Sequence, residues 1–169
     1  MVVAATGITS VQLDDIIDLI ANSATFQTWV GAETPAAAKS SIYVEAIPTN
    51  PVSSRPFAII TIEQITEQSV AGGSKTAFAP MRTYGLAFEM NITAGDTPKD
   101  AAYRFFNSVD AIWDEIKDLT GTGAYINIDN FQASSGPFRA SGRRGKNDGD
   151  YMFREHTLTV GFESSGGEV

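Results

Sequence analysis

The segment from Thr97 to Leu119 constrains the fold more than any other part of the sequence, because it predicts a long helix with one apolar face. Thr97 stands at the expected N-terminal cap, Pro98 follows at the first helical position, and Asp100 completes a capping box. Apolar residues then recur at helical spacing along one side: Ala102, Phe105, Phe106, Val109, Ile112, Trp113, Ile116 and Leu119. A stripe this broad needs a broad apolar partner, which one face of a β-sheet supplies.

A second amphipathic helix is expected earlier in the chain, from about Ser10 to Trp29. Thr9 with Gln12 predicts its capping box, and Gly31 predicts its end. The rest of the chain has strand-like alternation or apolar runs in five places: Ile42–Ile47, Phe57–Val70, Tyr84–Ile92, Ala124–Phe131 and Tyr151–Glu163. This order predicts an α+β fold, with a mainly antiparallel sheet packed by two amphipathic helices.

The length of 169 residues suits one domain. We expect residues 1–163 to form a single α+β domain that carries two large excursions. One is a long protruding β-hairpin at about 57–92, and the other is a basic loop at about 134–150. Residues 164–169, rich in Ser and Gly, are expected to form a flexible tail.

The hairpin is unusually long for a single domain. With its tip at Gly72-Gly73, Val70 is predicted to lie opposite Lys75. At ~3.3 Å per residue, about 14 residues a side would reach roughly 45 Å before Pro80 interrupts one strand. Two readings stay open: a surface hairpin without a partner, or an arm that pairs with neighbouring subunits. The candidate interface residues of the arm are Glu67, Val70, Lys75, Phe78 and Met81.

A second candidate contact segment holds four bases and no acid between residues 139 and 146. The bases are Arg139, Arg143, Arg144 and Lys146. The segment is either a solvated loop or a stretch that orders against an acidic protein surface or a nucleic acid. The overall charge of −8 makes a protein the better partner of the two.

Composition excludes several classes of chemistry. The absence of cysteine removes disulfides, thiol catalysis and thiolate metal sites. The single histidine, His156, stands in a predicted strand without a second histidine beside it, so triads and histidine metal sites are not expected. No apolar run approaches 18 residues, and the N-terminus lacks a basic leader, so we expect neither a membrane span nor a secretory signal. No catalytic, cofactor or metal site is predicted, and the chain is not expected to be an enzyme.

The order of elements resembles the tail terminator proteins, also called tail completion or neck proteins, of long-tailed bacteriophages. The resemblance rests on soft patterns over residues 10–163: the first helix, Arg55-Pro-Phe-Ala-Ile-Ile-Thr-Ile62, the hairpin with Tyr84-Gly-Leu-Ala-Phe-Glu-Met-Asn-Ile92, the capped helix Asp100–Trp113, and Arg154-Glu-His-Thr-Leu-Thr-Val-Gly-Phe162. It implies a structural virion protein that forms a homohexameric ring. The ring would cap the tail tube and join it to the head–tail connector or stopper protein.

The same resemblance implies assembly in the host cytoplasm, a place in the virion neck, and a lumen through which DNA passes without specific binding. Two alternatives remain. The chain could be another phage neck, tail-tube or connector component. In a different class, it could be a monomeric α+β domain that binds a ligand in a pocket under the second helix, near Tyr103 and Trp113.

Overall fold

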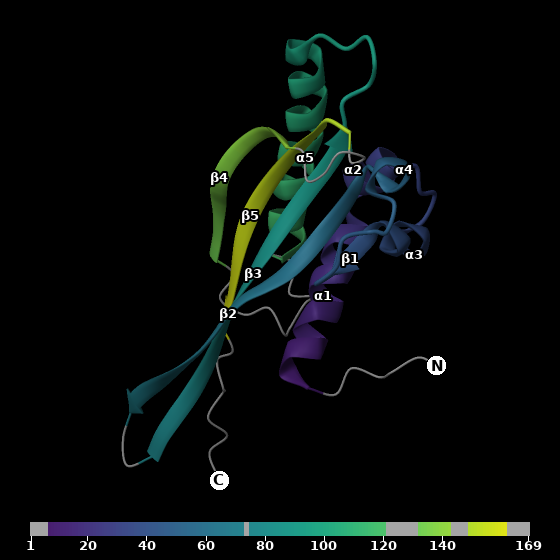
Figure 1. Cartoon of the computed structure of the whole chain (residues 1–169). Coiled ribbons are helices and arrows are strands. Elements are labelled where there is room, and N and C mark those ends of the chain that lie inside the picture. The colour runs from purple at the N-terminus through teal and green to yellow at the C-terminus, as the bar shows by residue number, and fades with distance from the viewer. Residues whose placement is uncertain (1–6, 73–74, 121–131, 143–148, 162–169) are drawn as a thin grey trace.

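The computed structural model describes residues 7–72, 75–120, 132–142 and 149–161. Along these residues the helices are α1 (Ile8–Asn22), α2 (Ala24–Val30), α3 (Pro35–Ala38), a 3-10 turn (Lys39–Ser41), α4 (Pro51–Ser54) and α5 (Pro98–Thr120). The strands are β1 (Ile42–Val44), β2 (Phe57–Gly72), β3 (Lys75–Asn91), β4 (Gln132–Gly142) and β5 (Tyr151–Gly161). The predicted α+β class is confirmed (Figure 1).

The strands form one mixed sheet in the order β1-β2-β3-β5-β4. β1 runs parallel to β2, whereas β2–β3, β3–β5 and β4–β5 are antiparallel. The register of β2 shifts between Ile62 and Gln64, which leaves Glu63 as the extra residue of a β-bulge. The predicted strand at Ala124–Phe131 and the predicted tail at 164–169 lie outside the described residues.

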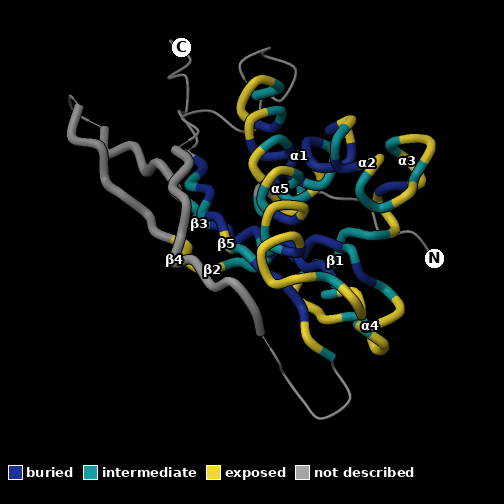
Figure 2. Tube along the Cα trace, turned by 90° about the horizontal axis from the view of Figure 1, so that it is seen from above, coloured by how far each residue is buried: buried dark blue, intermediate teal, exposed yellow. Residues whose placement is uncertain are grey.

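The hydrophobic core lies between one face of this sheet and helices α1, α2 and α5, which group on one side of the strands (Figure 2). Alternate residues of β2, β3 and β5 supply the sheet side of the core: Ala58, Ile60, Tyr84, Leu86, Phe88, Met152, Leu158 and Val160. The helices supply Ile16, Leu19, Ile20, Phe26, Phe105, Val109, Ile112, Trp113 and Ile116. The buried residues of α5, which recur about every 3.6 residues, therefore pack against buried strand residues that recur every second residue.

Helix α5 begins as its sequence predicts. The Asp100 amide donates to the Thr97 hydroxyl at 3.2 Å, and that hydroxyl donates to the Asp100 carboxylate at 2.6 Å. The N-terminal prediction is wrong in detail, because two helices replace one. Ser23 breaks the run with an extended backbone and caps α2 by accepting the Phe26 amide at 3.0 Å. Gly31 ends α2 in the left-handed conformation, as expected.

The predicted capping box of the first helix is also wrong. Gly7 occupies the cap of α1 without a side-chain hydrogen bond, and Thr9 lies inside the helix. Gln12 is buried, and its side-chain oxygen accepts a 2.9 Å hydrogen bond from the Tyr84 hydroxyl. Thr9 and Gln12 therefore match the capping-box pattern in the sequence, but their side chains accept hydrogen bonds from Arg82 and Tyr84 of β3 instead.

The prediction of a basic loop at 134–150 is wrong for its first half, because Gln132–Gly142 forms strand β4. Its Ser- and Gly-rich sequence reads as a loop, yet it pairs along the open edge of β5. The register shifts between Ser135 and Phe138 and again between Arg139 and Gly142. These shifts accommodate Gly136 and Pro137, since an edge strand tolerates a residue without an amide proton at a bulge.

Within the described ranges, no helix combines the length and the hydropathy that crossing a membrane requires.

His156 is buried under α5, where its ring stacks on Trp113 with 4.2 Å between centroids. Among the described residues, neither ring nitrogen has a hydrogen-bond partner. Burial lowers the pKa of His156 to about 4, with a further contribution from the nearby Arg154 and Lys117 cations. The ring is therefore uncharged in the folded protein at neutral pH and belongs to the core.

We predict that this histidine makes folding sensitive to acid. Because the unfolded pKa is 6.5 and the folded pKa about 4, the unfolded state alone takes up a proton between these values. Stability is fully present above pH 6.5 and falls as the pH drops towards 4, by up to about 3 kcal/mol. His156→Phe keeps the stacked ring and should flatten this slope in urea unfolding curves recorded from pH 7 to 4. An unchanged slope in the variant would assign the acid sensitivity to other groups.

Candidate assembly interface

The outer part of the β2–β3 hairpin pairs only with itself in the part of the chain that the structure describes. β5 pairs with β3 from Asn91 to Met81, and β1 pairs with β2 up to Ile60. Beyond these points the two strands continue as a two-stranded ribbon to Gly72 and Lys75. Figure 1 shows this ribbon leaving the sheet and the helices behind. We call residues 66–81 the arm.

The arm register differs from its prediction by two residues. Gly72 pairs with Lys75, and Val70 pairs with Ala77 instead of Lys75. The turn therefore lies one residue later in the chain than predicted, between Gly72 and Lys75. A shift of two residues keeps the alternation of the strand, whereas a shift of one would invert it. Pro80 does not interrupt β3, because among the described residues it pairs only with Glu67, and such an edge position tolerates proline.

All five candidate residues of the arm belong to this ribbon. Their register partners are Pro80 for Glu67, Ala77 for Val70, Gly72 for Lys75, Ser69 for Phe78, and both Thr66 and Gly161 for Met81. Of the four basic candidates, Arg139 lies in β4 opposite Phe153. Arg143, Arg144 and Lys146 lie outside the described residues.

The base of the arm is tied to α1 by two hydrogen bonds that the sequence does not reveal. The Arg82 Nε donates to the Thr9 hydroxyl at 2.8 Å, and the Tyr84 hydroxyl donates to Gln12. Burial raises the pKa of Tyr84 to about 12, against the opposing effect of the Arg82 cation. The ribbon therefore leaves from an anchored base.

The α2–α5 junction is held by one carboxylate. Glu115 accepts hydrogen bonds from the Ser23 hydroxyl at 2.7 Å, from the Thr25 amide at 3.1 Å and from the Thr25 hydroxyl. Partial burial raises the pKa of Glu115, but these hydrogen bonds outweigh it and lower the pKa overall. The break between α1 and α2 is thus fixed by a residue more than 90 positions away in the chain.

A buried ion pair holds the other end of the sheet. The side chains of Arg55 and Glu89 are both fully buried, and the Arg55 Nε donates to the Glu89 carboxylate at 3.1 Å. The guanidinium also donates to the Asn91 side chain at 3.2 Å and lies 3.9 Å from the ring centroid of Tyr151. This cluster joins the start of β2 to β3 and β5 on the face opposite the helices.

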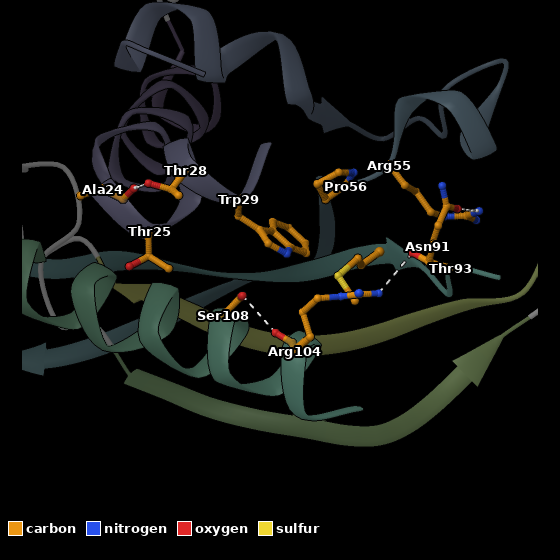
Figure 3. Close-up of a pocket in the computed structure, with 11 residues that line it drawn as sticks. Ala24, Thr25, Thr28, Trp29, Arg55, Pro56, Asn91, Thr93, Arg104 and Ser108 are labelled. Carbon is orange, nitrogen blue, oxygen red and sulfur yellow. Dashed lines mark hydrogen bonds between the residues drawn. The ribbon is translucent and has the colours of Figure 1, made fainter. Parts of the chain in front are cut away.

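A cavity of about 710 Å³ lies between α2 and α5 (Figure 3). Its lining includes Thr28, Trp29 and Met90, and both of its guanidinium groups already have a carboxylate. Arg55 is paired with Glu89, and Arg104 with Asp96 at 2.6 Å. The hydrogen bond from Arg104 lowers the pKa of Asp96. The described residues that line the cavity therefore offer no unpaired charge to a ligand.

The ligand pocket predicted near Tyr103 and Trp113 differs in position from this cavity, which neither residue lines. Tyr103 is 59% exposed, and Trp113 is buried against His156. Among the described residues, no group of three His, Asp or Glu side chains gathers in a way that could hold a metal ion. Compared with the cavity, the arm therefore points more directly to a function.

We predict that the buried ion pair is costly to break from one side. Arg55→Met should lower the free energy of unfolding by about 3–5 kcal/mol, because it leaves the Glu89 carboxylate buried without a cation. Changing both partners, Arg55→Met with Glu89→Leu, should recover most of that loss. Arg104→Met removes a partly exposed pair and serves as the control, with a smaller loss. Urea unfolding measures all three, and an Arg55→Met variant as stable as wild type would contradict the prediction.

A scan against protein-family models finds no matching family, and a search of curated proteins finds no significant match. The function is therefore inferred from the geometry described above and from the resemblance noted in the sequence.

Proposed function

We propose that this chain is a structural, ring-forming assembly protein that acts as a tail terminator of a long-tailed bacteriophage. In this role a homohexameric ring caps the tail tube and joins it to the head–tail connector or stopper protein. The protein is not an enzyme in this proposal, and its mechanism is steric. The ring ends tube growth because it offers the next tube subunit no matching surface.

One observation carries the proposal: beyond Met81 at its base, which pairs with Gly161, the arm has two strand edges without a partner among the described residues. From Thr66 to Gly72 it extends roughly 23 Å at ~3.3 Å per residue. An isolated two-stranded ribbon is marginal in water, and its free edges favour pairing with another chain. A neighbouring subunit supplies such a partner through strand addition, for which β4 offers the terminal edge of its sheet.

The charge and the element order add support. A net charge of −8 suits a lumen through which DNA slides without adhering. The order of helix, strands, hairpin, long helix and closing strand matches the element order to which the sequence is similar. Virion localisation in the neck follows from the same proposal.

We predict that deleting the arm abolishes the ring and spares the fold. Because Thr66 lies directly opposite Met81, residues 67–80 can be replaced by an Asn-Gly turn without changing the register. Wild type, at 18.1 kDa per copy, should form a species of about 109 kDa in native mass spectrometry. The deletion variant should remain a monomer with an unchanged near-ultraviolet circular dichroism spectrum.

The matched control carries the same turn at the tip of a full-length arm, Gly73→Asn with Ser74→Gly, and should form the ring. A ring assembled from the deletion variant would show that assembly does not need the arm. Wild type that stays monomeric both alone and on purified tail tubes would contradict the proposed function as a whole.

A further inference from the structure

The sheet face opposite the helices carries a groove of about 400 Å³, a volume within the range of binding sites. Its floor is formed by Ile59 of β2 and by Gly85 and Ala87 of β3, and Glu155 of the adjacent strand β5 lies at its rim. The small residues of β3 hollow the face at its centre. A Cβ atom at Gly85 would lie 2.5 Å from the Glu63 carboxylate oxygen and 2.6 Å from the Thr61 hydroxyl. The shape of the groove therefore depends on the glycine.

The groove is apolar at its floor and acidic at its rim. Glu45, Glu63 and Glu155 come from different parts of the chain and are all exposed. Ile47, 50% exposed, forms part of the wall. Within the described ranges, neither Glu63 nor Glu155 has a cation at salt-bridge distance. The rim thus has carboxylates that no described residue neutralises.

The backbone holds one rim residue in an unusual conformation. Glu45 has a φ of 52°, which a residue with a side chain rarely adopts. Its amide donates to the Ile60 carbonyl at 2.9 Å, and its carboxylate accepts from the Ile62 amide. Such conformations persist only where surrounding contacts over-determine them. Glu45 therefore shapes the wall, and Glu63 and Glu155 supply the unpaired charge.

The chain itself contains a segment of complementary charge. Residues 139–146 carry four bases and no acid in a protein whose net charge is −8. An acidic groove repels acidic partners such as nucleic acid and favours a basic peptide. Pro137-Phe138 immediately precedes the segment and adds apolar side chains suited to an apolar floor.

Chain geometry favours a segment from another copy. Gly142 pairs with Tyr151 and the described chain resumes at Gly149, so the two ends that residues 143–148 must join both lie near that end of β5. Six residues that leave and return reach about 10 Å from their ends. Gly85 pairs with Thr157, six residues further along β5 and about 20 Å away. The centre of the groove is therefore beyond the backbone of the same copy's residues 143–148, while Arg139 of that copy is held in β4 opposite Phe153.

We propose that this groove receives the basic segment 139–146 of a neighbouring copy in the assembled ring. The inference rests on the proposed ring-forming function and names a second contact in it, separate from the arm. The carboxylates of Glu63 and Glu155 bind the arginine and lysine side chains, and the apolar floor contacts the residues between them.

Charge reversal tests the contact. The groove variant carries Glu63→Lys with Glu155→Lys, and the segment variant carries Arg143→Glu with Arg144→Glu. Each variant alone should raise the midpoint concentration of ring formation by about tenfold or more in native mass spectrometry, because like charges then meet. The matched control, Glu33→Lys with Asp118→Lys, makes the same change in net charge as the groove variant, but at exposed sites outside the groove. It should leave the midpoint unchanged.

A mixture of the two variants tests whether the groove binds the segment of a second copy or the segment of its own copy. In an equimolar mixture, each lysine groove meets a glutamate segment and each glutamate groove meets an arginine segment, so alternating rings should form near the wild-type concentration. A mixture that assembles no better than either variant overturns the inference. Glu63→Gln with Glu155→Gln gives a milder version if the lysine variant fails to fold, and it should raise the midpoint in the same direction.

A labelled peptide of residues 137–147 tests the groove without the ring. It should bind the full chain in fluorescence anisotropy, and the groove variant should weaken this binding by about tenfold, as should raised salt. Equal binding to both chains overturns the inference whatever the oligomeric state. If the arm deletion abolishes the ring while the groove variant assembles like wild type, the groove inference fails and the proposed function stands. If the peptide binds but wild type never assembles, the proposed function fails instead.

Discussion

The structure depends on burial on one side of a sheet. The apolar stripe of α5 and the apolar residues of α1 and α2 all use the same face of β2, β3 and β5. The opposite face has a small buried cluster around Arg55 and Glu89 at one end, and small or charged residues elsewhere. Antiparallel sheets commonly divide in this way. Within the described residues, the division leaves the groove on the opposite face and the outer edges of the arm without a partner.

The long helix and the fold class could be predicted because their signals are local. The capping residues and apolar stripe of α5 lie within one stretch of sequence, and Thr97 performs the expected role. The break in the first helix could not be predicted, because the apolar stripe continues across Ser23. What stabilises the break is Glu115, and no local pattern connects two positions so far apart.

The strands and the candidate interface show a similar limit. Two adjacent glycines allowed more than one turn, so the arm was predicted with its register displaced by two residues. β4 reads as a loop from its composition and becomes a strand because β5 has an open edge. The arm and the basic segment were accessible to sequence reasoning as unusual composition. The groove was not, since Glu45, Glu63 and Glu155 are brought together only by the pairing of the sheet.

The bulge at Glu63 has a geometric consequence for the proposed assembly. Contacts between unlike surfaces close into a ring only when the rotation from one copy to the next divides a full circle. Any other rotation builds an open helix. A bulge bends a strand and increases its twist, and this one lies in β2 three residues before the arm begins. In a ring built through the arm, the single extra residue of β2 therefore acts on the rotation per subunit. The backbone of one strand would thereby contribute to the symmetry number of the ring.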